Sequence, residues 1–248
     1  RNYPVGDRDR KRVSDAMQAA FLTRPSWEWE AIFGAAKAPA SAQRSTAEWL
    51  ADPHALASGL VLELDDPRHG PMRQMGNLAW VLEDAGAMDK QPGPVTDEFR
   101  SDLPALLSEV PRAAPKGAGQ GGWLDGLRVV DLTNVIAGPT IGATLARFGA
   151  KVTSVQPVSP SVDPWNAIVF GLHAHRGKES VLLDLGGEPG RAALERLIAD
   201  ADVVTMNGTD EQRDALGLSP ERLAALNPRA ILVQLDAWGG SMRGPKSD

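Results

Sequence analysis

The sequence predicts an α/β protein with a Rossmann-like parallel sheet and flanking helices in its C-terminal half, preceded by a smaller α+β segment. Beyond residue 123, short apolar runs alternate with helix-like stretches. This alternation is typical of parallel βαβ units with right-handed crossovers. Before residue 82, amphipathic helix patterns lead into two short runs that favour a β-hairpin.

The first 82 residues predict three helices and the hairpin. An apolar stripe at i, i+4, i+7 and i+8 predicts an amphipathic helix over residues 9–23, which is expected to pack on one side. Ser26 is the expected cap of a second helix that ends near Gly34. A third helix, stopped by Asp52-Pro53, is expected at residues 46–50, and the hairpin strands at residues 60–64 and 72–75.

The C-terminal half predicts an open sheet with helices on both faces. Strands or strand-like apolar runs are expected at residues 127–132, 151–155, 180–185, 202–205 and 230–235, and helices at residues 140–148, 189–199 and 220–225. In such sheets ligands bind beyond the carboxyl ends of the strands. The loops after Leu132, Val155 and Met206 are therefore candidate binding surfaces.

Between the two halves, Gly, Pro and Ala become frequent and periodicity fades, apart from a helix-like stretch at residues 96–109. Residues 111–122 combine free glycines with stiff prolines and have nothing to bury, as linkers do. We expect an α+β segment over residues 1–110, a linker over 111–122, and a Rossmann-like segment over 123–248.

Composition limits the partners. With 42% hydrophobic and 23% charged residues, the chain resembles ordinary soluble globular proteins, and no apolar run approaches the ~20 residues that span a bilayer. The net charge of −6 argues against nucleic acid as a partner. The absence of cysteine excludes disulfides, zinc–thiolate sites and thiol nucleophiles. Since no export signal is visible at the N-terminus, we expect a cytoplasmic location.

The turn at residues 135–139 is the strongest candidate site. It precedes a helix start, where unpaired N–H groups and the helix dipole favour an anion such as pyrophosphate. The alternative is that Gly138 and Pro139 only shape a strand-to-helix turn. His173 and His175 would share one face of a strand, but they lack suitably spaced acids, so no metal site is expected. No nucleophile elbow supports a Ser-His-Asp triad.

Several segments carry a family resemblance. The stretch Leu124–Pro139 is followed in order by residues 145–152, 176–185, 201–204 with Asn207, 216–218 and 227–229. Together they resemble the N-terminal part of family III CoA-transferases, the CaiB/BaiF group of the CoA-transferase and acyl-CoA racemase superfamily. Residues 49–54, 58–61 and 70–76 resemble that family's C-terminal part. The chain is thus similar to the tail of one repeat followed by the head of a second.

The resemblance and the ends of the chain lead to an expectation about its completeness. The chain begins at Arg1 without Met and stops inside a polar loop, so we expect a portion of a tandem polypeptide, with a permuted sequence as the alternative. In the family an aspartate carboxylate attacks an acyl-CoA thioester. The resemblance places that aspartate shortly after Gly244-Pro245, outside this chain, so no catalytic residue is expected within it and the chain alone is expected to be inactive.

The resemblance also implies coenzyme A as co-substrate, acyl-CoA and a carboxylic acid as partners, and either a homo-oligomer or the remainder of a tandem polypeptide. The CoA contacts it implies are Ile136, Ala137, Leu183, Asp184, Leu185, Asn207 and Gly208, with Arg176 and Lys178 as phosphate-binding cations. Pro157 and Ala215 stand where the family has basic residues, which puts the affinity in doubt. Two alternatives stay open: an acyl-CoA racemase or dehydratase of the same superfamily, and a non-catalytic degenerate repeat acting as a CoA-binding or dimerisation module.

Overall fold

A computed structural model describes residues 6–77, 79–81, 105, 122–159, 164–240, 242 and 244–246. The chain divides into two compact units. Unit 1 comprises Arg1–Ala79 together with Gly240–Ser247, and unit 2 comprises Trp80–Gly239 with Asp248. Residues 82–104 and 106–121, which hold most of the predicted linker and of the predicted helix at 96–109, lie outside the described residues.

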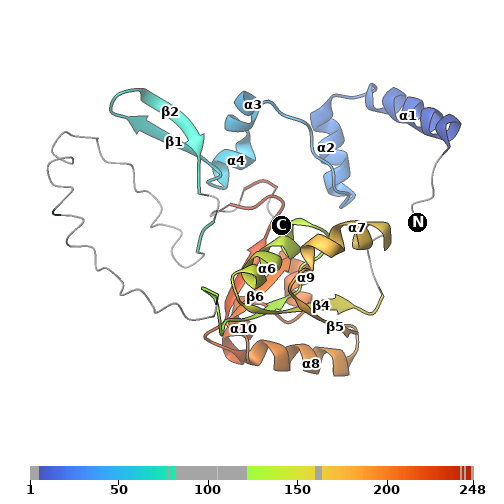
Figure 1. Ribbon diagram of the computed structural model, residues 1–248. Helices are drawn as coiled ribbons and strands as arrows, with labels where there is room; N and C mark the ends of the chain where they lie inside the picture. The colour runs from blue at the N-terminus through green and yellow to red at the C-terminus, as the bar shows by residue number, and fades with distance from the viewer. Residues whose placement is uncertain are drawn as a thin grey trace. The chain divides into compact units, whose positions relative to one another are not determined.

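Unit 1 begins with the helices that the sequence predicts and one that it does not. They are α1 (Asp7–Phe21), α2 (Ser26–Ala35), α3 (Thr46–Leu50) and α4 (Pro53–Ala57) (Figure 1). Pro25 is the N-cap of α2 and makes no side-chain cap, so the prediction that Ser26 caps this helix is wrong. Asp52 does follow the end of α3, but it also caps α4, because its Oδ1 accepts from the amides of His54 (2.8 Å) and Ala55 (3.4 Å).

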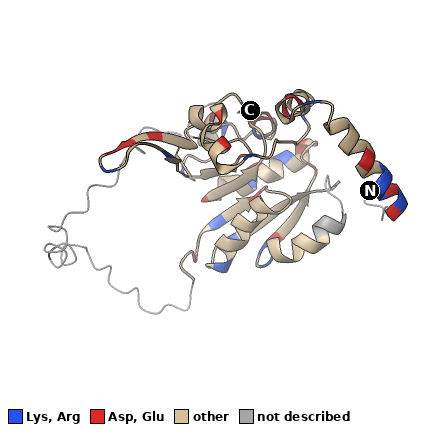
Figure 2. Cartoon of the chain, turned by 90° about the horizontal axis from the view of Figure 1, so that it is seen from above, with Lys and Arg blue, Asp and Glu red and all other residues tan. Residues whose placement is uncertain are grey.

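Helix α1 has the predicted stripe but not the predicted packing. Val13, Met17 and Phe21 remain 42–52% exposed, and none of the residues of α1 is buried. Acidic and basic side chains alternate along the helix, as Figure 2 shows, and form i,i+3 and i,i+4 ion pairs such as Lys11–Asp15 at 2.7 Å. Phe21, at the end of α1, packs edge-on against Trp29 of α2, with ring centroids 5.3 Å apart.

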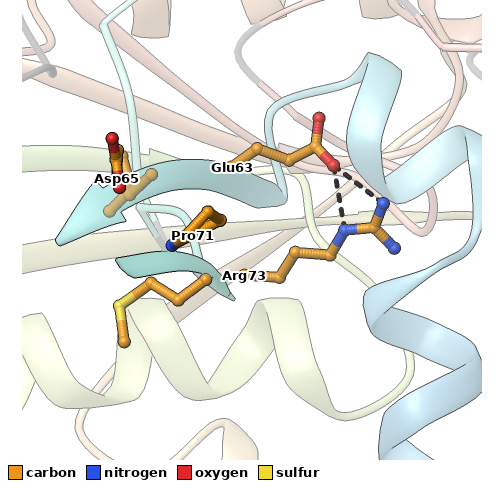
Figure 3. A pocket seen from close by; sticks show the side chains of 6 residues that line it. Glu63, Asp65, Pro71 and Arg73 are labelled. Atoms are coloured by element: carbon orange, nitrogen blue, oxygen red, sulfur yellow. Dashed lines mark hydrogen bonds and ion pairs between the residues drawn. The ribbon is translucent and has the colours of Figure 1, made fainter. Parts of the chain in front are cut away.

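The hairpin of unit 1 is confirmed. Strands β1 (Val61–Asp66) and β2 (Gly70–Met75) pair antiparallel, with Glu63 opposite Arg73. Arg73 donates from Nε (2.9 Å) and Nη2 (2.7 Å) to Glu63 Oε1, and both side chains border an open hollow on the hairpin (Figure 3). Because this pair is exposed, it contributes at most about 1 kcal/mol.

A charged cluster joins distant parts of unit 1. Arg44 pairs with Glu30 at 2.5 Å and with Asp52 at 2.9 Å. Lys246, which belongs to the segment after the last strand, lies 3.3 Å from Glu30 through Nζ and donates its amide to His54 Nδ1 at 3.0 Å. The hydrogen bond from Arg44 lowers the pKa of Glu30 from 4.5 to about 2. The cluster therefore attaches Lys246 to unit 1.

Unit 2 contains the predicted parallel sheet. Its strands are β3 (Arg128–Asp131), β4 (Lys151–Pro157), β5 (Glu179–Leu183), β6 (Val203–Asn207) and β7 (Ile231–Leu235), in the order β5-β4-β3-β6-β7. The helices are α6 (Ala137–Arg147), α7 (Pro164–Ala174), α8 (Glu188–Ala199), α9 (Asp210–Ala215) and α10 (Pro220–Leu226) (Figure 1). This confirms the fold class; α7 and α9 were not expected.

The core of unit 2 lies on both faces of the sheet. Val130 belongs to a buried cluster with Leu194 of α8 and Leu223 of α10. Its neighbour Val129 points the opposite way, into a second cluster that Leu145 of α6 borders. Burial on both faces explains why the strands are near-continuous apolar runs. Within the described residues, no helix is both long and apolar enough to cross a membrane.

Candidate functional site

The strand order of unit 2 places a topological switch point at the end of β3. The chain passes from β3 to β4 on one side and later returns to β6 on the other side of β3. Loops leaving the carboxyl ends of β3 and β6 therefore diverge, and such a switch point is where open α/β sheets bind ligands. The turn after β3, residues 133–139, lies at this point.

The backbone of this turn is unusual. Val135 has a φ of 68°, which β-branched residues rarely adopt. Ile136 is the N-cap of α6 and makes no side-chain cap, so no Ile136 side chain satisfies the first amides of the helix; Pro139, in the first turn, has no N–H to donate. Val135 and Ile136 are 52% and 41% exposed and Ala137 is exposed, whereas Gly138 and Pro139 are buried. The turn thus exposes its first half, up to the first residue of α6, and buries its Gly-Pro pair.

A buried polar layer lies directly beneath the turn. Asp131, Ser154 and Thr205 occupy the same register on β3, β4 and β6, and all three are 0% exposed. Asp131 Oδ1 accepts from the Thr133 amide (3.0 Å), from Thr133 Oγ1 (2.5 Å) and from Thr205 Oγ1 (2.9 Å). Asp131 therefore anchors the first residues of the turn to the sheet.

Lys178 completes this layer. Its Nζ lies 2.6 Å from Asp131 Oδ2 and donates to the Pro139 carbonyl at 2.7 Å, and the side chains of both ion-pair partners have zero exposure. The resemblance implied that Lys178 binds a CoA phosphate. In the structure its ammonium is buried beneath the turn instead, where it binds Asp131 of β3 and the Pro139 carbonyl in the first turn of α6.

Asn207 and Gly208 lie beside the turn. The Asn207 side chain accepts from the Asn134 amide (2.8 Å) and donates to the Asn134 carbonyl (3.1 Å), which mimics one rung of a β-ladder. Gly208 precedes α9, whose capping box joins Thr209 and Gln212. Asn207 is thus attached to Asn134, two residues before Ile136, and Gly208 follows it directly in the chain.

The other implied contacts lie elsewhere in unit 2. The loop 183–185 follows β5, the edge strand that β4 separates from β3. Asp184 Oδ1 accepts from the Gly186 amide at 3.1 Å, and Arg191 donates to the Leu185 carbonyl at 2.9 Å, so this loop is attached to the start of α8. Arg176 is exposed, and among the described residues it forms no ion pair.

The two histidines do not share a face. His173 lies in the last turn of α7 and His175 just follows this helix, so the strand spacing considered for them is wrong. His175 Nδ1 lies 3.4 Å from Ser154 Oγ. Burial first, and then Lys178, lower the pKa of His175, which keeps its imidazole neutral at pH 7. Within the described residues, no group of His, Asp and Glu is arranged to hold a metal ion.

Sequence reasoning missed the buried layer. Asp131, Thr133 and Thr205 were not singled out, although an acidic residue directly after the apolar pair Val129-Val130 is a usable signal, because a carboxylate buried there must find a partner.

Comparison with known proteins places these features in a family. The family model for CoA-transferase family III matches residues 4–98 and 124–248. The chain therefore belongs to CoA-transferase family III.

Individual relatives agree. The chain is 37% identical to a CoA-transferase/lyase DddD of Marinomonas over 99% of its length, which is 30% of that protein. It is 33% identical to an acetyl-CoA:oxalate CoA-transferase of Acetobacter aceti, over 54% of this chain and 35% of the relative. A solved CaiB/BaiF family protein from Brucella suis is 35% identical, with a TM-score of 0.44 over 46% of this chain and 33% of that one. The chain thus spans about a third of the length of these relatives.

Proposed function

We propose that unit 2 is the CoA-binding part of a family III CoA-transferase, with the turn 135–139 receiving a phosphate of CoA. The observation that carries this proposal is the turn itself: the start of a helix without a side-chain cap, whose first residue Ala137 is exposed, beside Asn207 and at the switch point of a parallel sheet. Ala137 is exposed and has only a methyl side chain, which lets a phosphate approach the start of the helix closely.

In the complete polypeptide, this unit would support transfer of CoA between carboxylic acids. We infer that the nucleophilic carboxylate lies outside the chain, beyond Gly244-Pro245, and that the isolated chain binds CoA without turning over acyl-CoA. Membership of the family and the alignment with DddD over 99% of the chain support the parent activity. Of the implied cations, Arg176 stays exposed and can reach a phosphate from solvent.

One observation favours a second candidate, a degenerate repeat that only binds CoA or dimerises. The family's basic residues are replaced by Pro157 and Ala215, and Lys178 is buried in an ion pair. Fewer cations therefore face a ligand than the resemblance implied. Under this hypothesis CoA binds weakly or not at all, and light scattering at micromolar concentration shows association.

Calorimetric titration with free CoA tests the proposal. Ala137→Trp places an indole at the exposed first residue of α6 and is expected to weaken CoA binding about tenfold or more, because the indole blocks the approach of a phosphate to the helix start. Ala224→Trp is the matched control, because Ala224 is also exposed on a helix of unit 2 but lies on α10. If both variants bind CoA as the wild type does, the turn is not the site. If the wild type shows no binding, the proposed function fails.

A further inference from the structure

The Asp131–Lys178 pair differs from every other ion pair in the described part of the chain, because neither side chain is exposed at all. Removing two charges from water is costly, and a well-packed apolar pair of similar volume would often be as stable. Stability alone therefore does not account for a fully buried pair at this place. The contacts of Asp131 and Lys178 explain better why a buried ion pair occurs here.

The pair holds both ends of the turn. At the start, Asp131 Oδ1 accepts from the amide and hydroxyl of Thr133. At the end, Lys178 Nζ donates to the carbonyl of Pro139 at 2.7 Å. Between these points, the Asn207 side chain pairs with the backbone of Asn134. The seven residues of the turn, 133–139, are thus attached at three positions.

The turn needs such attachment. Val135 has a φ of 68°, a conformation that costs a β-branched residue about 1–3 kcal/mol and persists only where the surroundings impose it. Space around the pair is also limited. A Cβ on Gly142 of α6 would lie 2.6 Å from Asp131 Oδ2 and 3.1 Å from Lys178 Cε. Helix α6 therefore carries glycine where it passes over the pair.

We propose that Asp131 and Lys178 are positioning residues that hold the turn 133–139 in its ligand-binding conformation and do not themselves contact CoA. The proposal rests on the proposed function of the turn. A direct phosphate contact by Lys178 would require its ammonium to leave a fully buried position and would leave the Asp131 carboxylate buried without its cation, which is strongly unfavourable.

Three variants of the full chain test the proposal: Lys178→Met, Asp131→Asn and the double variant. Lys151→Met is the matched control, because Lys151 is an exposed lysine of the same sheet that pairs with Glu179 at 3.5 Å. For each protein we would measure the midpoint of thermal unfolding, amide hydrogen exchange in a peptide covering residues 133–140, and the dissociation constant for free CoA.

Each single variant is expected to lower the unfolding midpoint, because it leaves one charge buried without its partner. The double variant should regain most of that midpoint, yet residues 133–140 should still exchange faster than in the wild type. Its CoA affinity should stay about tenfold or more below the wild type, since apparent affinity falls with the fraction of molecules in the competent conformation. Lys151→Met should change none of the three measurements.

The outcomes separate the two proposals. Unchanged exchange of residues 133–140 in the single variants would overturn the positioning role, whether or not CoA binds. A double variant that regains both stability and full CoA affinity would also overturn it and leave a purely structural pair. A wild type that does not bind CoA, together with fast exchange in the variants, would refute the proposed function while supporting the positioning of the turn.

Discussion

Gly142→Ala is a sharp test of the packing around the buried pair. Gly142 lies inside α6, and an added Cβ would come within 2.6 Å of Asp131 Oδ2. That oxygen cannot simply move away, because the same carboxylate is held by Thr133 and Thr205. The methyl group therefore has to displace either the carboxylate or the helix.

The expected magnitude follows from opposing effects. Replacing glycine by alanine inside a helix gains about 1 kcal/mol of helix propensity. Overpacking a rigid core costs about 1–3 kcal/mol. Separating the buried pair would cost about 3–5 kcal/mol. After the gain in helix propensity is subtracted, overpacking leaves a loss of up to about 2 kcal/mol and separation of the pair a loss of about 2–4 kcal/mol, so we expect Gly142→Ala to destabilise unit 2 by roughly 2 kcal/mol, the value common to both.

Urea unfolding followed by amide exchange of β3 reports on unit 2 alone. Gly171→Ala is the matched control in α7, because its Cβ would find its nearest neighbour, His175 Cδ2, at an ordinary 3.6 Å. This control should be up to about 1 kcal/mol more stable than the wild type. If Gly142→Ala proved as stable as Gly171→Ala, the tight packing around Asp131 and Lys178 would be refuted.

Two other predictions concern the remaining buried polar groups. Asn227 is 5% exposed and donates from Nδ2 to the carbonyls of Ile198 (2.9 Å), Ala199 (3.2 Å) and Ala201 (2.8 Å). Asn227→Ala leaves these carbonyls unpaired and should lower the free energy of unfolding, measured in urea, by about 2–3 kcal/mol. A loss below about 0.5 kcal/mol would contradict this. The lowered pKa of Glu30 means that its carboxylate stabilises unit 1 fully above about pH 4.5 and loses this effect as the pH falls through about 2. The stability difference between wild type and Glu30→Gln should therefore narrow from pH 4.5 to pH 2 in acid titrations, and a constant difference would show that the charge is not responsible.

Much of the fold follows from local patterns. The five strands of unit 2 are short apolar runs separated by turn residues, and the structure has all of them within a few residues of the expected bounds. Helix α7 was missed because its sequence, PWNAIVFGLHA, is apolar nearly all round and so lacks a helical stripe. Helices α4 and α9 were missed because they have only 5 and 6 residues, and their signal lies in the caps Asp52 and Thr209.

The candidate site, too, could be predicted only in part: the turn from local sequence, its distant partners not. The Gly138-Pro139 pair marks the turn in the sequence, because proline is favoured in the first turn of a helix and this pair lies in the first turn of α6. The partners of the turn carry no such mark. Lys178 is 47 residues from Asp131, and Asn207 is 73 residues from Asn134. The resemblance implied that Lys178 and Asn207 contact CoA. In the structure, Lys178 binds Asp131 and the Pro139 carbonyl, and Asn207 binds the backbone of Asn134.

The sequence by itself determined the class of fold, the succession of strands and helices, and the place of the turn, because each depends on residues within a few positions of one another. Only the tertiary structure decided which polar groups meet beneath that turn. The sheet order β5-β4-β3-β6-β7 places Asp131, Ser154 and Thr205 side by side. Because the Asp131 carboxylate is buried, it needs a cation, and Lys178 provides it. A buried charge must be paired, but the periodicity of the sequence cannot predict which distant residue supplies the partner.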